Sequence, residues 1–148
     1  MKGVIIKKLD TSHDTRGWLS EIYREDEINH KVSMAYVSMT EPYVTRGPHE
    51  HLFQTDMFYF MGKIELHLWD NREDSDTYGE HSVLTCGYDN YLVIVPPRVV
   101  HAYRNVTPTP AIVVNMPDKL YKGEGKASET DEIRHENRED SKFKIEGV

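Results

Sequence analysis

The sequence has almost no cysteine, since Cys86 is the only one among 148 residues. A single thiol excludes an internal disulfide framework and any zinc site built from several cysteines. Long apolar runs are also missing, because no stretch approaches the roughly 20 apolar residues that a membrane helix requires. The longest run, Met57–Met61, is only as long as a strand, and the first ten residues lack the apolar segment of a secretory signal. We therefore expect no membrane partner and a cytoplasmic location.

Positive charge is scarce as well. The chain carries 18 Lys and Arg against 25 Asp and Glu, which gives a formal net charge of −7 and a pI of about 5.6. This balance argues against a nucleic-acid partner, although a few arginines in one pocket would still hold a small phosphorylated ligand. The length of 148 residues, with 38% apolar and 29% charged residues, is typical of one globular domain.

The pattern of apolar residues predicts short strands. Ile64–Trp69 alternates apolar and polar residues, which is typical of a half-buried strand. Met57–Met61 and Leu92–Val95 are continuous apolar runs, which predict strands covered on both faces. Further strands are expected at Val4–Lys7, Trp18–Tyr23, Met34–Met39, His81–Cys86, Val99–Arg104 and Ala111–Asn115. A spacing of about 8–12 residues favours an all-β antiparallel sandwich or barrel. One short helix is expected at Glu25–Lys31.

The composition changes at Lys122. We expect residues 1–121 to form the domain and residues 122–148 to form a short, irregular, charged C-terminal tail. The tail holds eight acidic and six basic residues, a mixture that is usually solvated. Its isolated large apolar residues, chiefly Ile133, Phe143 and Ile145, indicate that it lies over the domain or over a partner subunit.

The densest group of chemically active residues is Arg46-Gly47-Pro48-His49-Glu50-His51. Histidines at positions i and i+2 point to the same face of a strand, so an inward face would place both imidazoles in one cavity. Asp56 follows shortly, and His101 comes after a double proline, where it is an expected neighbour across the barrel. Taken alone, these histidines could also be structural residues.

This arrangement resembles the two-part motif of the cupin jelly rolls: His-x-His, an acid and Gly, with Pro and His about 40–50 residues later. In metal-binding cupins the two histidines, the acid and the late histidine are ligands. Here these residues would be His49, His51, Asp56 and His101. The resemblance implies a cupin-type fold, and a divalent transition metal as one possible cofactor.

Four segments, in order over about residues 10–105, narrow the resemblance to the dTDP-4-dehydrorhamnose 3,5-epimerases and related nucleotide-sugar enzymes. Asp14-Thr-Arg16-Gly17-Trp-Leu-Ser-Glu21 is similar to that family's Asp-Arg-Gly-Phe-Phe-Ser-Glu. Arg46-Gly47-Pro48-His49 is similar to its Arg-Gly-Leu-His. The segment from Asp70 to Gly79 and Val95-Pro96-Pro97 with His101 resemble two further family motifs.

The resemblance implies roles for individual residues. His49 would be the catalytic base, assisted by His51, and Tyr121 would be the acid. Arg46 and His101 would bind substrate. Arg16 and Glu21 would contact the nucleotide, and the resemblance allows this contact to come from the other subunit of a homodimer. The family's enolate-stabilising lysine would fall near Thr55 or Asp56 and is missing, and its histidine-orienting carboxylate would be Glu136 or Asp140.

The leading hypothesis is an epimerase that acts on a dTDP-4-keto-6-deoxy-hexose in deoxysugar or cell-surface polysaccharide biosynthesis. No organic cofactor is expected, because the ketone of the substrate itself makes the neighbouring C–H acidic. His-x-His after Arg-Gly also resembles the related 3,4-ketoisomerases, which move a proton between C3 and C4. A metal-binding cupin and a non-catalytic relative remain further alternatives.

Overall fold

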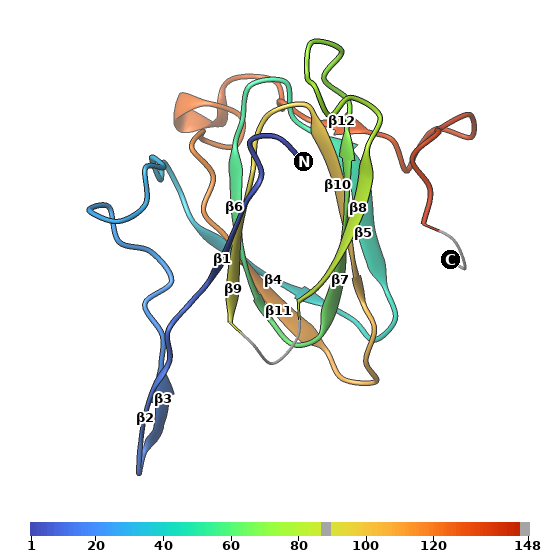
Figure 1. The fold of residues 1–148 in the computed structure, drawn as a ribbon. Coiled ribbons are helices and arrows are strands. Elements are labelled where there is room, and N and C mark those ends of the chain that lie inside the picture. Colours follow the sequence, from blue (N-terminus) through green and yellow to red (C-terminus); the bar gives the residue numbers. More distant parts are fainter. Residues whose placement is uncertain (87–89, 146–148) are drawn as a thin grey trace.

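The computed structural model describes residues 1–86 and 90–145 as two five-stranded antiparallel sheets that face each other (Figure 1). The first sheet has the order β1 (Ile5–Lys8), β9 (Tyr91–Val95), β6 (Asp56–Met61), β11 (Ala111–Asn115) and β4 (Tyr36–Thr40). The second has the order β12 (Ile133–Arg134), β5 (Thr45–Glu50), β10 (Val99–Asn105), β7 (Ile64–Asp70) and β8 (His81–Cys86). The predicted all-β antiparallel jelly-roll sandwich is confirmed. No helix among the described residues has the length and apolar character needed to cross a membrane.

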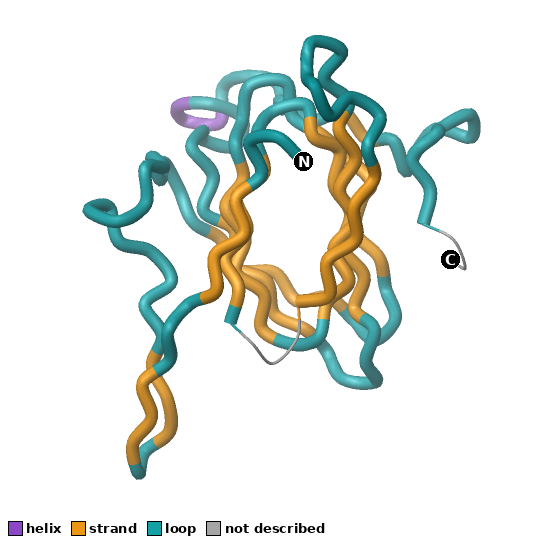
Figure 2. The backbone as a smooth tube through the Cα atoms, viewed as in Figure 1, coloured by secondary structure: helices purple, strands orange, loops and turns teal. Residues whose placement is uncertain are grey.

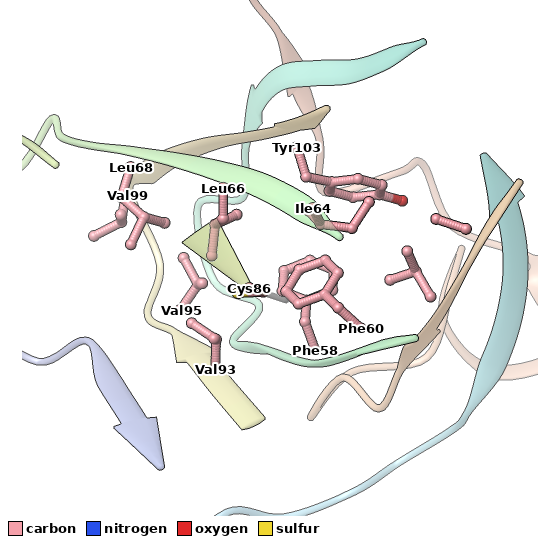
Figure 3. Close-up of a cluster of buried hydrophobic side chains, with 12 residues drawn as sticks. Phe58, Phe60, Ile64, Leu66, Leu68, Cys86, Val93, Val95, Val99 and Tyr103 are labelled. Carbon is pink, nitrogen blue, oxygen red and sulfur yellow. The ribbon is translucent and has the colours of Figure 1, made fainter. Parts of the chain in front are cut away.

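The core fills the space between the two sheets (Figure 3). Strand β6 supplies Phe58 and Phe60, and β10 supplies Val99 and Tyr103. The remaining members are Ile64, Leu66, Leu68, Cys86, Val93, Val95, Ala111 and Val113. Inward residues alternate with outward ones along these strands, so each strand from β6 to β11 contributes one face to this core. Cys86 is a buried core residue, and burial raises the pKa of its thiol to about 12.

Strand β6 is buried on both faces, as its continuous apolar run predicts. Its outward residues Met57 and Tyr59 belong to a second cluster, which the segment after the first hairpin covers with Ile22, Tyr23 and Ile28. Two predictions for this segment are wrong. Glu25–Lys31 is a turn followed by irregular backbone instead of a helix, and the strand expected at Trp18–Tyr23 ends at Leu19. Ile28 is the one apolar residue between Glu25 and Lys31, so the segment lacks the apolar stripe that would stabilise a helix against the sheet.

A small hairpin, β2 (Ser12–Asp14) and β3 (Gly17–Leu19), projects away from the two sheets (Figure 1). All of its residues are exposed, including Trp18 at 52% and Leu19 at 64%. Large apolar side chains in such an arm are unusual on a free surface.

The chain after Lys122 crosses to the second sheet, against which it lies from Ile133 on. It contains a single 3₁₀ turn, η1 (Glu124–Lys126), which is the only helical segment in the described residues (Figure 2), and then β12, which pairs with β5. Further on, His135 donates to buried Glu50 at 2.9 Å, and Phe143 packs on Trp69. Residues 146–148 lie outside the described part of the chain.

Candidate functional site

One large cavity collects most of the polar side chains that the sequence singles out. Its volume is about 1320 Å³, and its lining comes from β4, β5 and β10, residues 117–126, and residues between 129 and 136. Arg46, His49, His51 and Tyr121 all line it, so the structure brings these four predicted residues together. A smaller cavity of about 540 Å³ beside the hairpin contains none of the predicted site residues.

His49 and His101 lie directly opposite each other on β5 and β10. Their rings meet edge to face, with the centroids 4.4 Å apart and the planes at 72°. Gly47 permits this approach, because a Cβ there would lie 2.6 Å from the His101 carbonyl oxygen and 3.1 Å from His49 Nδ1. Its φ of +83° is also a conformation that L side chains rarely adopt. Glycine at this position lets the two imidazoles share one site.

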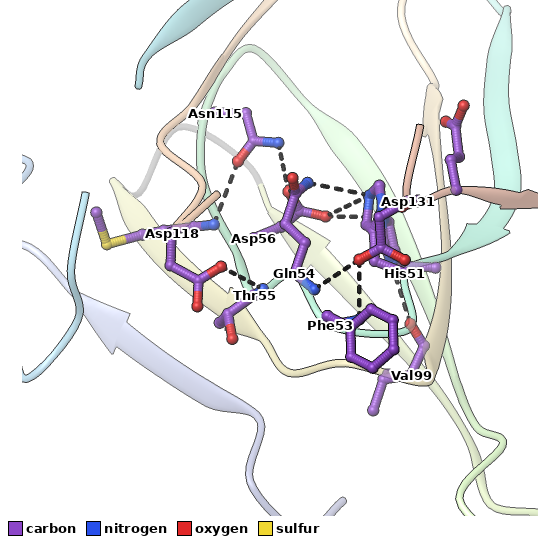
Figure 4. A network of polar contacts seen from close by, with 12 residues as sticks. His51, Phe53, Gln54, Thr55, Asp56, Val99, Asn115, Asp118 and Asp131 are labelled. Atoms are coloured by element: carbon purple, nitrogen blue, oxygen red, sulfur yellow. Dashed lines mark hydrogen bonds and ion pairs between the residues drawn. The ribbon is translucent and has the colours of Figure 1, made fainter. Parts of the chain in front are cut away.

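A buried carboxylate links His51 with His101 (Figure 4). Asp56 Oδ2 lies 3.2 Å from His51 Nε2 and 3.4 Å from His101 Nε2. The second contact lacks hydrogen-bond alignment, so His101 Nε2 has no hydrogen-bond partner within the described residues. Each ring donates its Nδ1–H to a main-chain carbonyl, that of Asp131 for His51 and that of Val99 for His101. Both Nε2 atoms are therefore directed toward one carboxylate oxygen.

Asp131 of the tail fixes the loop that follows β5 (Figure 4). Its carboxylate accepts hydrogen bonds from the backbone N–H groups of Leu52, Phe53 and Gln54 at 2.9, 2.8 and 2.9 Å. Its carbonyl oxygen accepts from the His51 ring, so one residue holds both the loop and an imidazole. Sequence analysis missed Asp131, because nothing around it distinguishes it from the other acidic residues of the tail.

The three histidines differ in charge because their surroundings differ. Burial, together with repulsion from His101 and His51, lowers the pKa of His49 to about 2. Burial also acts to lower the pKa of His51, but the hydrogen bond to Asp56 and the charge of Asp56 outweigh it and raise this pKa to about 9. Burial lowers the pKa of His101, although Asp56 opposes it. At neutral pH, His51 is thus an imidazolium paired with an ionised Asp56, while His49 and His101 are neutral.

The same rings also suit a metal ion. One nitrogen from each of His49, His51 and His101 lies within 4.8 Å of the other two. Imidazole nitrogens with a nearby carboxylate are ligands that divalent transition metals prefer. Metal-binding histidines commonly donate their other N–H to a carbonyl, as His51 and His101 do here. The residues therefore fit such an ion.

Arg46 lies at the cavity with its guanidinium already oriented. Nε donates to Thr40 Oγ1 at 3.1 Å, and Nη2 donates to the Met39 carbonyl at 2.7 Å. These two bonds to β4 hold the planar group in place and leave its remaining N–H groups for a ligand.

The two predicted nucleotide contacts are not at this cavity. Arg16 lies in the hairpin, where it pairs with Asp14 and its side chain is 88% exposed. Glu21 lies 3.6 Å from Arg24, on the segment that follows the hairpin. Neither residue lines the cavity of its own chain.

The carboxylates considered as orienting groups for His49 differ in position. Glu136 lines the cavity and Asp140 does not. Within the described residues, no hydrogen bond joins the His49 ring to either carboxylate. Two further residues were missed from the sequence, Tyr36 on β4 and Asn115 on β11, which are joined by a hydrogen bond of 2.8 Å. The alternation of β4 could have indicated that Tyr36 faces inward.

The chain is similar to known proteins in sequence and in fold. The model of the dTDP-4-dehydrorhamnose 3,5-epimerase family matches residues 1–139. The chain is similar to the probable low-salt glycan biosynthesis epimerase Agl13 of Haloferax volcanii, with 36% identity over 123 residues, covering 80% of this chain and 79% of that protein. It is also similar to the spore coat polysaccharide biosynthesis protein SpsL of Bacillus subtilis, with 37% identity over 115 residues and 76% coverage of both proteins. A crystal structure of a dTDP sugar isomerase from Desulfovibrio desulfuricans matches with a TM-score of 0.80 and 25% identity, over 90% of this chain and 83% of that one.

Proposed function

Because the chain belongs to the dTDP-4-dehydrorhamnose 3,5-epimerase family, we propose that it epimerises a nucleotide-linked 4-keto-6-deoxy sugar at a carbon beside the ketone. The observation that carries this proposal is the state of His49. Its imidazole is neutral, faces the large cavity and makes no hydrogen bond within the described residues. A free lone pair of this kind is what a general base requires.

The positive charge of His51 favours the enolate that proton abstraction forms, although it disfavours a protonated His49 in the absence of substrate. A base with a pKa of about 2 in the empty cavity is weak, because burial and neighbouring rings disfavour its charged form. The enolate that forms on the substrate is negative, and an opposite charge at short range raises the pKa of an imidazole. The His51 imidazolium, 5.8 Å from His49 between ring centroids, supplies fixed positive charge on the same wall. It assists where the lysine of the family is missing.

The rest of the substrate would be held by groups at the mouth of the cavity. Arg46 presents N–H groups suited to the oxygens of a diphosphate or of the sugar. His101 is buried and does not line the cavity, so it would support the sugar end only through its contact with His49. No organic cofactor takes part in this proposal, since the ketone of the substrate delocalises the negative charge.

We propose a homodimer in which the hairpin of one chain completes the cavity of the other. Exposed Trp18 and Leu19 would be buried against the second chain, and this docking would bring Arg16 and Glu21 to the nucleotide. Replacing Trp18 with Ser should shift the protein from dimer to monomer in sedimentation equilibrium and raise KM. A wild-type monomer would contradict this assembly.

The biological setting is proposed from the relatives. Both curated relatives carry names from glycan or polysaccharide biosynthesis, so we place the product in the supply of deoxysugars to such polymers. The reaction would then occur in the cytoplasm, where nucleotides are available. Cell fractionation tests this location.

Incubation with dTDP-4-keto-6-deoxyglucose in deuterated water tests the reaction. Deuterium should enter at C3, at C5 or at both, together with an epimeric product, and His49→Gln should abolish its entry. Deuterium at C4 would instead indicate the 3,4-ketoisomerase alternative. No deuterium at any carbon would refute epimerase chemistry on this sugar.

A metal-dependent cupin is the second candidate, and the two Nε2 atoms directed at Asp56 favour it. His49, His51, His101 and Asp56 would hold the ion, which would act as a Lewis acid when bound. Elemental analysis after purification separates the candidates. The cofactor-independent proposal expects no stoichiometric metal and full activity after dialysis against a chelator. Stoichiometric metal that is lost in His51→Ala would favour the second candidate.

A further inference from the structure

Asn115 fixes the direction of a chain of hydrogen bonds that runs from β11 to the cavity. Its amide oxygen accepts from the Met57 backbone N–H at 3.2 Å. Its amide nitrogen donates to Asp56 Oδ1 and to the Tyr36 hydroxyl oxygen, both at 2.8 Å. A backbone N–H only donates and a carboxylate only accepts, so the amide cannot be turned round. The Tyr36 oxygen is therefore an acceptor in this chain.

This direction leaves the Tyr36 hydroxyl hydrogen available to a ligand. Among the described residues, the hydrogen bond from Asn115 is the only one to this hydroxyl. Burial, opposed by that hydrogen bond, raises the pKa of Tyr36 to about 12, so the group keeps its hydrogen at neutral pH. Tyr36 lines the same cavity as His49. Because β4 and β5 belong to different sheets, the donor and the base approach a bound sugar from different sheets.

Tyr121 lacks this arrangement. It lies on the irregular segment after β11, and no hydrogen bond holds its hydroxyl within the part of the chain that the structure describes. The Lys122 ammonium lies 5.7 Å from its ring centroid, and this contact does not orient the hydroxyl. A proton donor for stereospecific transfer must be held in position, and Tyr36 meets this requirement through Asn115.

We propose that Tyr36, and not Tyr121, delivers the proton to the substrate carbon on the side opposite His49. This inference rests on the proposed epimerase function. His49 removes the proton from the carbon beside the ketone, and the C–H electron pair passes into the enolate. The enolate carbon then takes the hydroxyl hydrogen of Tyr36, and the pair forms a new C–H bond on the opposite face. Water restores both groups, since it accepts a proton from the His49 imidazolium and returns one to the Tyr36 phenolate.

The test compares Tyr36→Phe, Tyr121→Phe and the wild type in deuterated water, with dTDP-4-keto-6-deoxyglucose as the substrate. Tyr36→Phe should lower epimer formation by about 100-fold or more, within the usual range for loss of a general acid. It should still exchange the substrate proton for deuterium with retained configuration, because His49 is intact and returns deuterium to the same face. Tyr121→Phe should form epimer at a rate within about threefold of the wild type. Tyr43→Phe, an exposed tyrosine outside the cavity, is the matched control.

Three outcomes would overturn the inference. They are normal epimer formation by Tyr36→Phe, exchange without epimer in Tyr121→Phe, and loss of both exchange and epimer in a folded Tyr36→Phe protein. Folding is checked by thermal denaturation, where loss of one hydroxyl at a residue that is 44% exposed should change Tm by about 3 °C or less. Failure of the wild type to exchange any deuterium would instead refute the proposed function.

Discussion

Gly47 offers a direct test of how tightly β5 must approach β10. In Gly47→Ala, the new Cβ would lie 2.6 Å from the His101 carbonyl oxygen, which belongs to the backbone of the paired strand and cannot rotate away. The residue would also have to keep a φ of +83°. Both effects act on the folded protein, and they can be separated.

The magnitude follows from adding the two effects. An L residue in a left-handed conformation costs about 1–2 kcal/mol. Forcing a methyl group into a filled site costs about 1–3 kcal/mol more. Gly79 isolates the first effect, because its φ is +81° and a Cβ there would meet nothing within 4 Å. We expect Gly79→Ala to lose about 1–2 kcal/mol of the free energy of unfolding and Gly47→Ala to lose about 2–5 kcal/mol.

Differential scanning calorimetry at a fixed protein concentration measures the difference. For a chain of this size, 1 kcal/mol corresponds to about 2–4 °C in Tm, so Gly47→Ala should melt several degrees below Gly79→Ala. Epimer formation by Gly47→Ala should fall by about tenfold or more, since a shift of His49 on the scale of 1 Å disturbs its approach to substrate. Gly79→Ala should keep its rate. Equal melting temperatures for the two variants would refute the argument that strand contact at His101 requires glycine.

The charges of the site give three further predictions. The pKa of His49 is lowered from 6.5 to about 2, so below pH 6.5 the unfolded chain binds a proton that the folded protein does not, and the free energy of unfolding falls as the pH drops. In urea denaturation, His49→Gln should make this fall smaller. A dependence on pH equal to that of the wild type would contradict the lowered pKa. The pKa of His51 is raised to about 9, so its imidazolium stabilises the folded protein fully below pH 6.5, and this stabilisation is lost as the pH rises through about 9. His51→Gln should therefore lose more of the free energy of unfolding at about pH 6 than at about pH 10. Equal losses at the two pH values would show that the imidazolium is not formed. Asp131→Ala removes the acceptor of three backbone N–H groups, which can bond to water instead, so we expect the free energy of unfolding to fall by about 1 kcal/mol. The rate of epimer formation should fall tenfold or more, while the exposed control Glu139→Ala should change neither quantity. A rate equal to that of the wild type would show that Asp131 does not support the site.

Much of the fold could be predicted from local pattern. Alternation and short apolar runs identified the strands around Phe58, Ile64 and Val93, because side chains on a two-layered β structure repeat every two residues. The prediction of a helix at Glu25–Lys31 was wrong, because a tertiary contact and not the local pattern decides the structure there. Its one apolar residue, Ile28, packs against the cluster that contains Met57 and Tyr59 of β6, a contact that no helical periodicity within the segment reveals.

The candidate site, too, could be predicted from the sequence only in part. The sequence by itself indicated that His49 and His51 point to the same side, since they lie two residues apart. The structure showed that this side faces the large cavity. The sequence also carried the four motifs of the family. Only the tertiary structure decided which ring is charged, because the neighbours that set the pKa values, Asp56 and His101, come from other strands. The same holds for Asp131 and Tyr36, whose hydrogen-bond partners lie 77 or more residues away along the chain, at separations over which sequence pattern carries no information about contact.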